Sequence, residues 1–153
     1  MNKKLQNLYT LLTLGVTLGA TMVDKMRLTF FLVASRIMHR RPSTKSFLVQ
    51  MNGAPVRIQL RNNYADAFVL DEAFRGNDYV LSLSKDPAVI FDLGANLGFV
   101  AISFALRYPH ARIYCFEPDP ENFKECVANT ATFSNITCFQ YAVGAKKETR
   151  YFY

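Results

Sequence analysis

The sequence has few of the side chains that most often bind metals, with three cysteines and two histidines among 153 residues. Cys115, Cys126 and Cys138 form no C-x-x-C pair and have no spacing typical of a metal site. Each lies among apolar neighbours in a strand or helix pattern, so we interpret all three as small buried residues in a reducing compartment. His39 and His110 are isolated, and His110 has the surroundings of a solvated turn. The sequence therefore predicts no metal site, disulfide or catalytic cysteine.

Acidic residues are nearly absent from the first 41 positions, which contain seven Lys or Arg and a single acid, Asp24. Residues 42–153 contain eleven charges of each sign, so the net charge of +6 belongs entirely to the N-terminal segment. A basic, apolar N-terminal segment followed by a neutral domain is typical of contact with a membrane surface or of a targeting sequence rather than of nucleic-acid binding. We therefore expect no nucleic-acid partner.

No charged residue occurs from Leu5 to Val23, a stretch close to the roughly 20 residues that span a bilayer, although polar residues make it a marginal span. The cationic residues that follow it would place the later domain in the cytoplasm. A cleaved signal peptide is less favoured. A helical arm that packs Leu28, Phe31 and Leu32 on its own domain is as well supported as membrane contact through residues 5–41. Gly15 and Gly19 have the spacing of a helix-pairing face, which is also common by chance.

Residues 40–44 read as a linker. The pattern of residues 47–76 after it predicts a lead-in β-hairpin followed by a helix. The hairpin has strands at 47–51 and 56–61 around Asn52-Gly53, the favoured chemistry of a tight turn. The helix runs over 66–75, with Gly76 as its stop. Its expected buried side is Phe68, Val69 and Ala73.

Residues 88–153 alternate strands and helices, which predicts an α/β fold with a parallel sheet. The expected strands are 88–91, 111–116 and 136–143, and another extended piece begins at Glu148. The expected helices are 99–107 and one starting at Pro120. The apolar run Val89-Ile90-Phe91 is typical of a strand covered on both faces. The second helix should bury Phe123, Cys126, Val127 and Ala131.

The stretch from Ala88 to Gly98 reads as a buried strand, a glycine-rich turn and the start of a helix. Such a unit aims backbone N–H groups and the positive helix end at a ligand above the sheet. Asp92, directly before the turn, would oppose a pyrophosphate and suits a ligand that carries positive charge, such as S-adenosylmethionine (SAM). The spacing of Gly94 and Gly98 also differs from the G-x-G-x-x-G of a dinucleotide-binding turn.

A second acid ends the next predicted strand. Glu117 is positioned to accept hydrogen bonds from both ribose hydroxyls, and it follows Gly98 by close to the roughly 20 residues expected for such an acid. Asp119 is favoured as the N-cap of the next helix, with Pro120 at its first position and a secondary contact of Asp119 to the adenine.

Residues 47–153 closely resemble the first part of an FkbM-type methyltransferase domain, a branch of the class I SAM-dependent methyltransferases. The matching pieces are 91–98, 111–123 and 141–144. The resemblance implies a partial Rossmann-like fold with the first three of seven strands in the order 3-2-1-4-5-7-6. It implies O-methylation of hydroxyls on sugars, polyketides and related natural products. The residues it implies for cofactor binding are Asp92, Gly94, Ala95, Asn96 and Gly98 at the methionine end, Glu117 with Pro118 and Asp119 at the ribose, and Ala142 and Val143 near the adenine.

The resemblance leaves the last four strands of such a domain without a counterpart. We therefore expect residues 1–153 to be an incomplete enzyme whose first strand is a sheet edge. No catalytic residue is predicted, the acceptor is a small molecule or glycan, and the location is cytoplasmic or at the cytoplasmic membrane face. Two alternatives remain open. One is a nicotinamide-dependent Rossmann enzyme, and the other is an inactive half-domain that binds a partner or a membrane.

Overall fold

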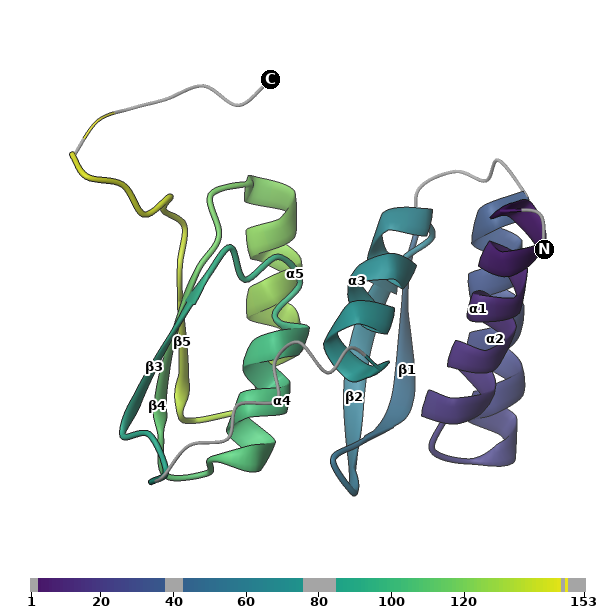
Figure 1. Ribbon diagram of the computed structural model, residues 1–153, viewed down its shortest axis with the longest axis horizontal. Helices are drawn as coiled ribbons and strands as arrows, with labels where there is room; N and C mark the ends of the chain where they lie inside the picture. The colour runs from purple at the N-terminus through teal and green to yellow at the C-terminus, as the bar shows by residue number, and fades with distance from the viewer. Residues whose placement is uncertain (1–2, 38–42, 76–84, 147, 149–153) are drawn as a thin grey trace. The chain divides into compact units, whose positions relative to one another are not determined.

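The computed structural model describes residues 3–37, 43–75, 85–146 and 148, and the chain divides into two compact units, Met1–Asn77 and Asp78–Tyr153 (Figure 1). The first unit contains two N-terminal helices, a β-hairpin and a third helix. The second contains a three-stranded parallel sheet and two helices.

The uncharged stretch at the N-terminus is divided between two helices, α1 (Lys3–Leu18) and α2 (Met22–Ile37). The helix is interrupted between Leu18 and Met22 because Thr21 and Asp24 cap the N-terminus of α2. The Asp24 amide donates to Thr21 Oγ1 at 3.2 Å, and the Thr21 amide donates back to Asp24 Oδ2 at 3.3 Å. This reciprocal arrangement is a capping box. Among the described residues, no helix has the length and apolar character needed to cross a bilayer.

The helical arm folds back on the hairpin. Leu28 and Leu32 are almost fully buried, and the Phe31 ring lies 4.9 Å from that of Phe47 on the first strand. The predicted packing of these three arm residues on the chain itself is therefore confirmed. A Cβ at Gly15 would overlap Thr29, so this glycine allows α1 and α2 to approach closely. Contact of the arm with a membrane stays a prediction. The exposed large apolar side chains on its outer surface are Tyr9, Leu12, Val16, Met22, Val23, Met26 and Phe30.

The predicted hairpin is confirmed, with longer strands than expected. Strands β1 (Thr44–Met51) and β2 (Ala54–Arg61) are antiparallel, and the turn residues Asn52 and Gly53 have φ of 44° and 81°. Two consecutive positive φ values are typical of the tight turn whose twist matches that of paired strands. The side chains that the hairpin buries alternate along both strands: Phe47, Val49, Met51, Val56, Ile58 and Leu60.

Helix α3 (Tyr64–Arg75) buries a different face from the one predicted. Ala67, Leu70 and Ala73 are buried, whereas Phe68 is 59% exposed. The reason is an ion pair at the start of the helix between the buried Asp66 and the partly buried Arg61. Asp66 accepts hydrogen bonds from the backbone amide of Arg61 at 2.9 Å and from its guanidinium at 2.8 Å. This pair sets the rotation of the helix on β2, which apolar spacing alone could not indicate. Gly76, the predicted helix stop, lies outside the described residues.

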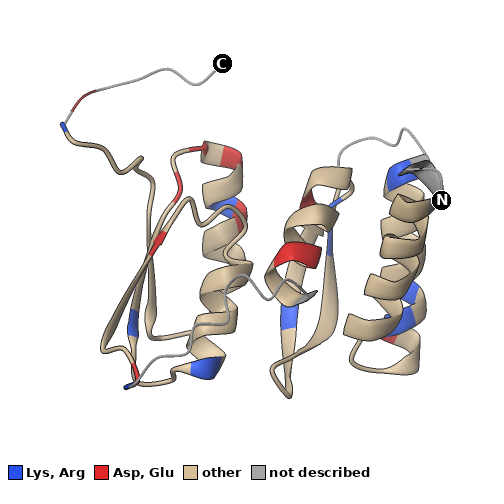
Figure 2. Ribbon diagram, viewed as in Figure 1, with Lys and Arg blue, Asp and Glu red and all other residues tan. Residues whose placement is uncertain are grey.

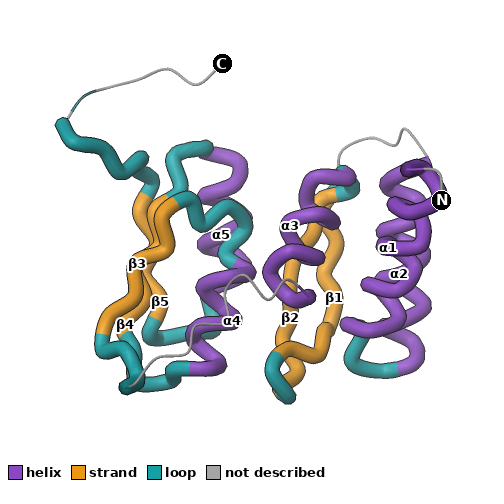
Figure 3. Tube along the Cα trace, viewed as in Figure 1, coloured by secondary structure: helices purple, strands orange, loops and turns teal. Residues whose placement is uncertain are grey.

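In the second unit, strands β3 (Val89–Leu93), β4 (Arg112–Phe116) and β5 (Ile136–Phe139) pair in parallel in that order. The connecting helices α4 (Phe99–Arg107) and α5 (Pro120–Thr130) cover the same face of this sheet (Figures 1 and 3). Two right-handed crossovers that progress in one direction produce this arrangement. The partial Rossmann-like α/β fold is therefore as predicted, except that β5 ends at Phe139 and residues 140–146 are coil.

The other face of the parallel sheet is bare in the described part of the chain. Phe91 and Leu93 are 63% and 60% exposed, so the prediction that the first strand is covered on both faces is wrong. The Phe91 ring stacks on Tyr114, and Phe116 stacks on Phe139, which makes this face aromatic. Strand β3 pairs with β4 alone among the described strands and is the expected edge.

The buried face of α5 also differs from the predicted one. Glu125, Cys126, Asn129 and Thr130 are buried, while Val127 is 43% exposed and Ala131 is exposed. Three of the four buried side chains are polar or charged, and the contacts of Asn129 and Thr130 are described below. The spacing of apolar residues therefore predicted the wrong buried face for α5.

The Arg61–Asp66 pair provides a test of the first unit. Replacing Asp66 with Ala leaves the Arg61 guanidinium and amide without their acceptor, and we expect a loss of about 3 kcal/mol in the free energy of unfolding. Glu72→Ala, on the exposed side of the same helix, is the control and should change stability by less than about 0.5 kcal/mol. Hydrogen exchange of the α3 amides measures both, and equal protection in the two variants would contradict the assignment.

Candidate cofactor site

The carboxyl ends of the three parallel strands meet at one edge of the sheet. Asp92 pairs in register with Cys115, and the Glu117 amide donates to the Phe139 carbonyl at 3.1 Å. The turn after β3, the segment after β4 and the coil after β5 therefore begin side by side. Figure 2 shows acidic positions on the ribbon at this end of the sheet and at the start of α5. Ligands of open parallel sheets bind at such an edge.

The glycine-rich turn is held in a left-handed conformation at three positions, with φ of 91° at Gly94, 50° at Asn96 and 80° at Gly98. Asn96 tolerates this geometry, as the sequence predicted. The amides of Gly94 and Ala95 both donate to the Phe116 carbonyl, at 2.8 and 3.1 Å. The Gly98 amide donates to the Ala95 carbonyl at 2.8 Å. These N–H groups bind the chain itself, so they do not form the predicted cradle for a ligand.

Glu117 joins this turn to the next helix. Its carboxylate is buried, with Oε2 accepting from the Asn96 amide at 2.8 Å and Oε1 from the Asp119 amide at 3.0 Å. A carboxylate oxygen has two lone pairs, so each oxygen can accept a second hydrogen bond. The structure thus gives Glu117 a structural role that the sequence did not predict, and its contact with ribose hydroxyls stays a prediction.

Asp119 is the N-cap of α5, as favoured from the sequence. Its Oδ1 accepts from the Asn122 amide at 2.8 Å, its carbonyl accepts from the Phe123 amide at 2.8 Å, and Pro120 begins the helix. Its contact with an adenine is untested. Pro118, between Glu117 and the cap, is partly exposed.

Ala142 and Val143 lie in the exposed coil beyond β5. Their predicted place near an adenine also stays a prediction.

Among the described acids at this edge, Asp92 has a buried carboxylate oxygen that accepts no hydrogen bond. Its Oδ2 is buried and has no hydrogen-bond partner among the described residues. Burial in the first place, and the neighbouring Cys138 and Glu117 in addition, raise the pKa of Asp92 from 3.8 to about 6. A buried carboxylate without a partner destabilises the fold until a positive or hydrogen-bonding group reaches it.

Helix α5 holds the far end of the turn through contacts that the sequence did not indicate. The Asn129 side chain is buried and donates from Nδ2 to the Leu97 carbonyl at 3.0 Å. A Cβ at Gly98 would lie 2.9 Å from Thr130 Cγ2 and 3.1 Å from Cys126 Sγ. Gly98 is therefore needed for close helix packing as well as for its positive φ. In the sequence Asn129 resembles any polar helix residue, and only the contact reveals its role.

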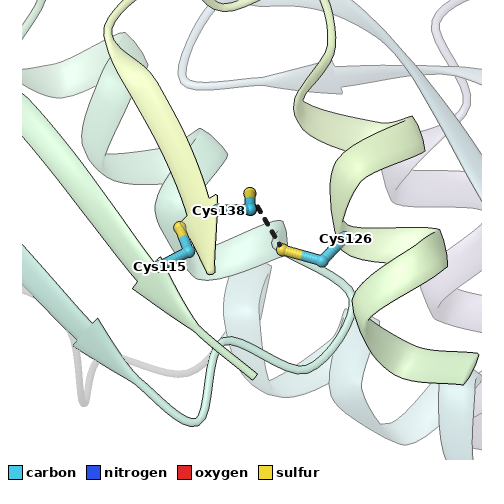
Figure 4. Close-up of side chains that lie close together, drawn as sticks. All are labelled: Cys115, Cys126 and Cys138. Atoms are coloured by element: carbon cyan, nitrogen blue, oxygen red, sulfur yellow. Dashed lines mark hydrogen bonds between the residues drawn. The ribbon is translucent and has the colours of Figure 1, made fainter. Parts of the chain in front are cut away.

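The three cysteines, interpreted from the sequence as unrelated buried residues, come together beneath α5 (Figure 4). Their sulfur atoms all lie within 4.8 Å of one another. Cys115 and Cys126 are buried as expected, and Cys138 is partly exposed. Hydrogen bonds with Cys115 and Cys126 lower the pKa of the Cys138 thiol below its ordinary value. The sequence carried no signal for this cluster, because the cluster follows from the register of β4 with β5, which makes Cys115 and Cys138 partners.

Part of the chain is similar to a known methyltransferase. A segment of 61 residues is 36% identical to the 2-O-methyltransferase NoeI of Sinorhizobium fredii, and it covers 40% of this chain and 25% of that protein. No protein-family model matches the chain, so the similarity to FkbM-type domains stays a prediction.

Two solved structures show lower similarity. One is a transferase of Pyrococcus horikoshii, with 19% identity and a TM-score of 0.44 over 63% of this chain and 36% of the other. The second is coclaurine N-methyltransferase bound to N-methylheliamine and SAH, with 10% identity and a TM-score of 0.40 over 97% of this chain and 41% of the other. The fold assignment rests on the strand order and helix placement of the chain itself.

The two glycines of the turn allow a matched test of packing. Ala at either position is strained by its positive φ, which costs about 1 kcal/mol. A Cβ at Gly94 meets nothing within 4 Å, whereas one at Gly98 meets Thr130 and Cys126. We therefore expect Gly98→Ala to lower the free energy of unfolding by about 1–3 kcal/mol more than Gly94→Ala does. Adding Thr130→Ser, which removes Cγ2, should recover part of the loss, and denaturant unfolding that shows equal losses would contradict this packing.

The raised pKa of Asp92 predicts a pH dependence. Between pH 3.8 and about 6 the folded chain retains a proton that the unfolded chain releases, so stability falls as the pH rises through this window. Asp92→Asn removes this term. Allowing for screening of a partly exposed group, we expect the variant to gain about 1–2 kcal/mol over the native chain by pH 7 and nothing at pH 3.5. Urea unfolding across this range measures the difference, and a pH-independent difference would refute the assignment.

Proposed function

We propose that residues 88–146 bind SAM and supply the cofactor-binding part of a methyltransferase. The observation that carries the proposal is the buried, unpartnered Oδ2 of Asp92 at the carboxyl edge of the parallel sheet. Beside it, a Cβ added to Gly94 would meet open space, so the turn leaves room for a ligand close to the backbone. The ammonium and sulfonium groups of SAM carry the positive charge that a carboxylate in this position needs.

The remaining contacts follow from the same edge. The free lone pairs of Glu117 suit donation from the two ribose hydroxyls, while its existing bonds to the Asn96 and Asp119 amides hold the carboxylate in place. Ala142 and Val143, in the coil after the neighbouring strand, offer an apolar surface for the adenine. Gly94, Ala95, Asn96 and Gly98 shape the turn, and Pro118 and Asp119 direct the chain from Glu117 into α5.

A nicotinamide dinucleotide is the less favourable ligand. A pyrophosphate needs free N–H donors, but the amides of Gly94 and Ala95 donate to the Phe116 carbonyl. The Gly98 amide donates to the Ala95 carbonyl, and that of Asn96 donates to Glu117. The Asp92 carboxylate would also repel the phosphate charge. Both facts favour a cationic ligand.

The proposed reaction is transfer of a methyl group to a hydroxyl oxygen of a sugar or a related small molecule. The similarity to a 2-O-methyltransferase supports an oxygen atom as the acceptor, although the matched segment is a quarter of that protein. When bound, SAM supplies an electrophilic methyl group. The chain's part is to hold the ligand's charged end at Asp92 and its ribose at Glu117, which restricts the direction from which an acceptor oxygen can approach. We assign no general base.

We further propose that residues 1–153 bind the cofactor without completing the reaction. In the described part of the chain, the aromatic face of the sheet is uncovered and β3 lacks a partner on its outer edge. An acceptor site in an open parallel sheet needs walls on both sides of the strand ends. Among the described residues, only the side formed by α4 and α5 is present.

Titration calorimetry of the full chain with SAM and with NAD tests the proposal. We expect SAM to bind more tightly than NAD, and Asp92→Asn to weaken SAM binding about tenfold to a hundredfold, because a charge-assisted hydrogen bond is lost. Glu121→Gln removes one exposed acid at the start of α5 and should leave affinity within about twofold. Tighter binding of NAD, or equal losses in the two variants, would refute the cofactor assignment.

A turnover assay with SAM labelled in its methyl group separates binding from catalysis. Binding without methyl transfer to simple sugars and phenols is the expected result. Methylation by the purified chain would contradict its incompleteness and leave the cofactor assignment intact.

A further inference from the structure

The cluster of three cysteines lies outside the proposed cofactor contacts and is the most concentrated set of metal-ligating atoms in the described part of the chain. We propose that Cys115, Cys126 and Cys138 form a three-sulfur binding site for a soft d10 metal ion, with Cu(I) as the ion that fits it best.

The fold itself brings the three sulfurs together. Cys115 and Cys138 are register partners on adjacent parallel strands, so both side chains project from the same face of the sheet. Cys126 belongs to the buried face of α5, which covers that sheet face, and its Sγ lies 3.5 Å from that of Cys138. Three separate elements each contribute one ligand, as in many metal sites.

The spacing suits a small ion bound by three sulfurs. A bond of about 2.3 Å from each sulfur to a central ion places the sulfurs about 4 Å apart in a planar triangle. The Cys126 and Cys138 sulfurs lie 3.5 Å apart, and no two of the three sulfurs are separated by more than 4.8 Å. Small rotations of the cysteine side chains are therefore enough to reach the bound geometry.

The surroundings select a soft ion with few ligands. The cluster is packed against apolar core residues such as Ala101, Ala105 and Ile113. No carboxylate or imidazole of the described residues joins the group of ligand atoms, and the nearest hydroxyl, Thr130 Oγ1 at 3.4 Å from Cys138 Sγ, is a poor ligand for a soft ion. Structural Zn²⁺ sites use four ligands, whereas Cu(I) is satisfied by thiolates in lower number.

Entry of the ion is possible from one side. Cys138 is partly exposed while the other two sulfurs are buried, so the ion can reach Cys138 first and then the pair behind it. Binding requires no oxidant: each thiol that becomes a ligand forms one metal–sulfur bond and releases one proton to water. The site therefore needs only the reduced chain and the ion.

The test uses the full chain, reduced and kept under nitrogen, titrated with Cu(I) against a chromophoric Cu(I) chelator. We expect one equivalent to bind per chain. Replacing any one cysteine with Ala should weaken binding on the order of a hundredfold or more, since a direct ligand is lost. Thr130→Val, which keeps the shape and all three sulfurs, is the matched control and should leave affinity within a few-fold. Equal losses in the control would overturn the proposal.

A second readout does not depend on variants that fold. Thiol alkylation followed by mass spectrometry should label Cys138 first in the metal-free chain and none of the three cysteines in the Cu(I)-loaded chain. Unfolding in denaturant should abolish this joint protection. The proposal would be overturned by protection of only one or two cysteines, by binding of Zn²⁺ in preference to Cu(I), or by a Cys126–Cys138 disulfide whose reduced form binds no Cu(I).

Discussion

The buried carboxylate of Glu117 is the interaction on which the cofactor site depends. It accepts from the Asn96 amide in the turn after β3 and from the Asp119 amide at the start of α5. Without it, two backbone N–H groups at the strand ends would lose their acceptor in a place partly closed to water, at a cost of about 1–3 kcal/mol each. The shape of the turn, the start of the helix and the position of the acid toward a ligand therefore share one cause. A substitution at Glu117 would change all three, which is why Asp92 is the better residue for separating binding from folding.

Elements whose signal is local could be predicted from the sequence. Asn52-Gly53 specified its own turn, Asp119-Pro120 specified its own helix start, and the run from Val89 followed by Gly94 and Gly98 specified a strand, turn and helix. In each case residues close together in the sequence supply the φ values or the capping hydrogen bond that specify the element, although hydrogen bonds to Phe116 and Glu117 also hold the turn at residues 94–98. The Thr21–Asp24 capping box is equally local. The apolar composition on either side of it made residues 5–23 resemble a marginal membrane span.

Features that arise between distant segments could not be predicted in this way. The rotation of α3 depends on the ion pair of Asp66 with Arg61, and that of α5 on the bond from Asn129 to the Leu97 carbonyl. Both helices bury a polar residue where apolar spacing had suggested a different face. The cysteine cluster is the clearest case, because it follows from the register of β4 with β5 and not from any spacing along the chain. The cofactor-binding residues are an intermediate case. Their place at the carboxyl edge of the sheet could be predicted from the sequence, but their hydrogen bonds could not.

Asp92, Cys115 and Cys138 occupy one row across the sheet, beneath the helices and at the end where the strands stop. The row combines two closely spaced thiols with a carboxylate whose Oδ2 has no hydrogen-bond partner among the described residues, and this buried oxygen costs stability in the absence of a ligand. A fold selected for stability alone would place apolar side chains in this row, as it does one step earlier with Ile90, Ile113 and Ile136. The contrast between the two rows supports ligand binding at the carboxyl end of the sheet. The apolar row provides the packing that holds the strands together, and the polar row offers ligand atoms, the Asp92 carboxylate for a cationic cofactor and the cysteine sulfurs for a metal ion that replaces their protons.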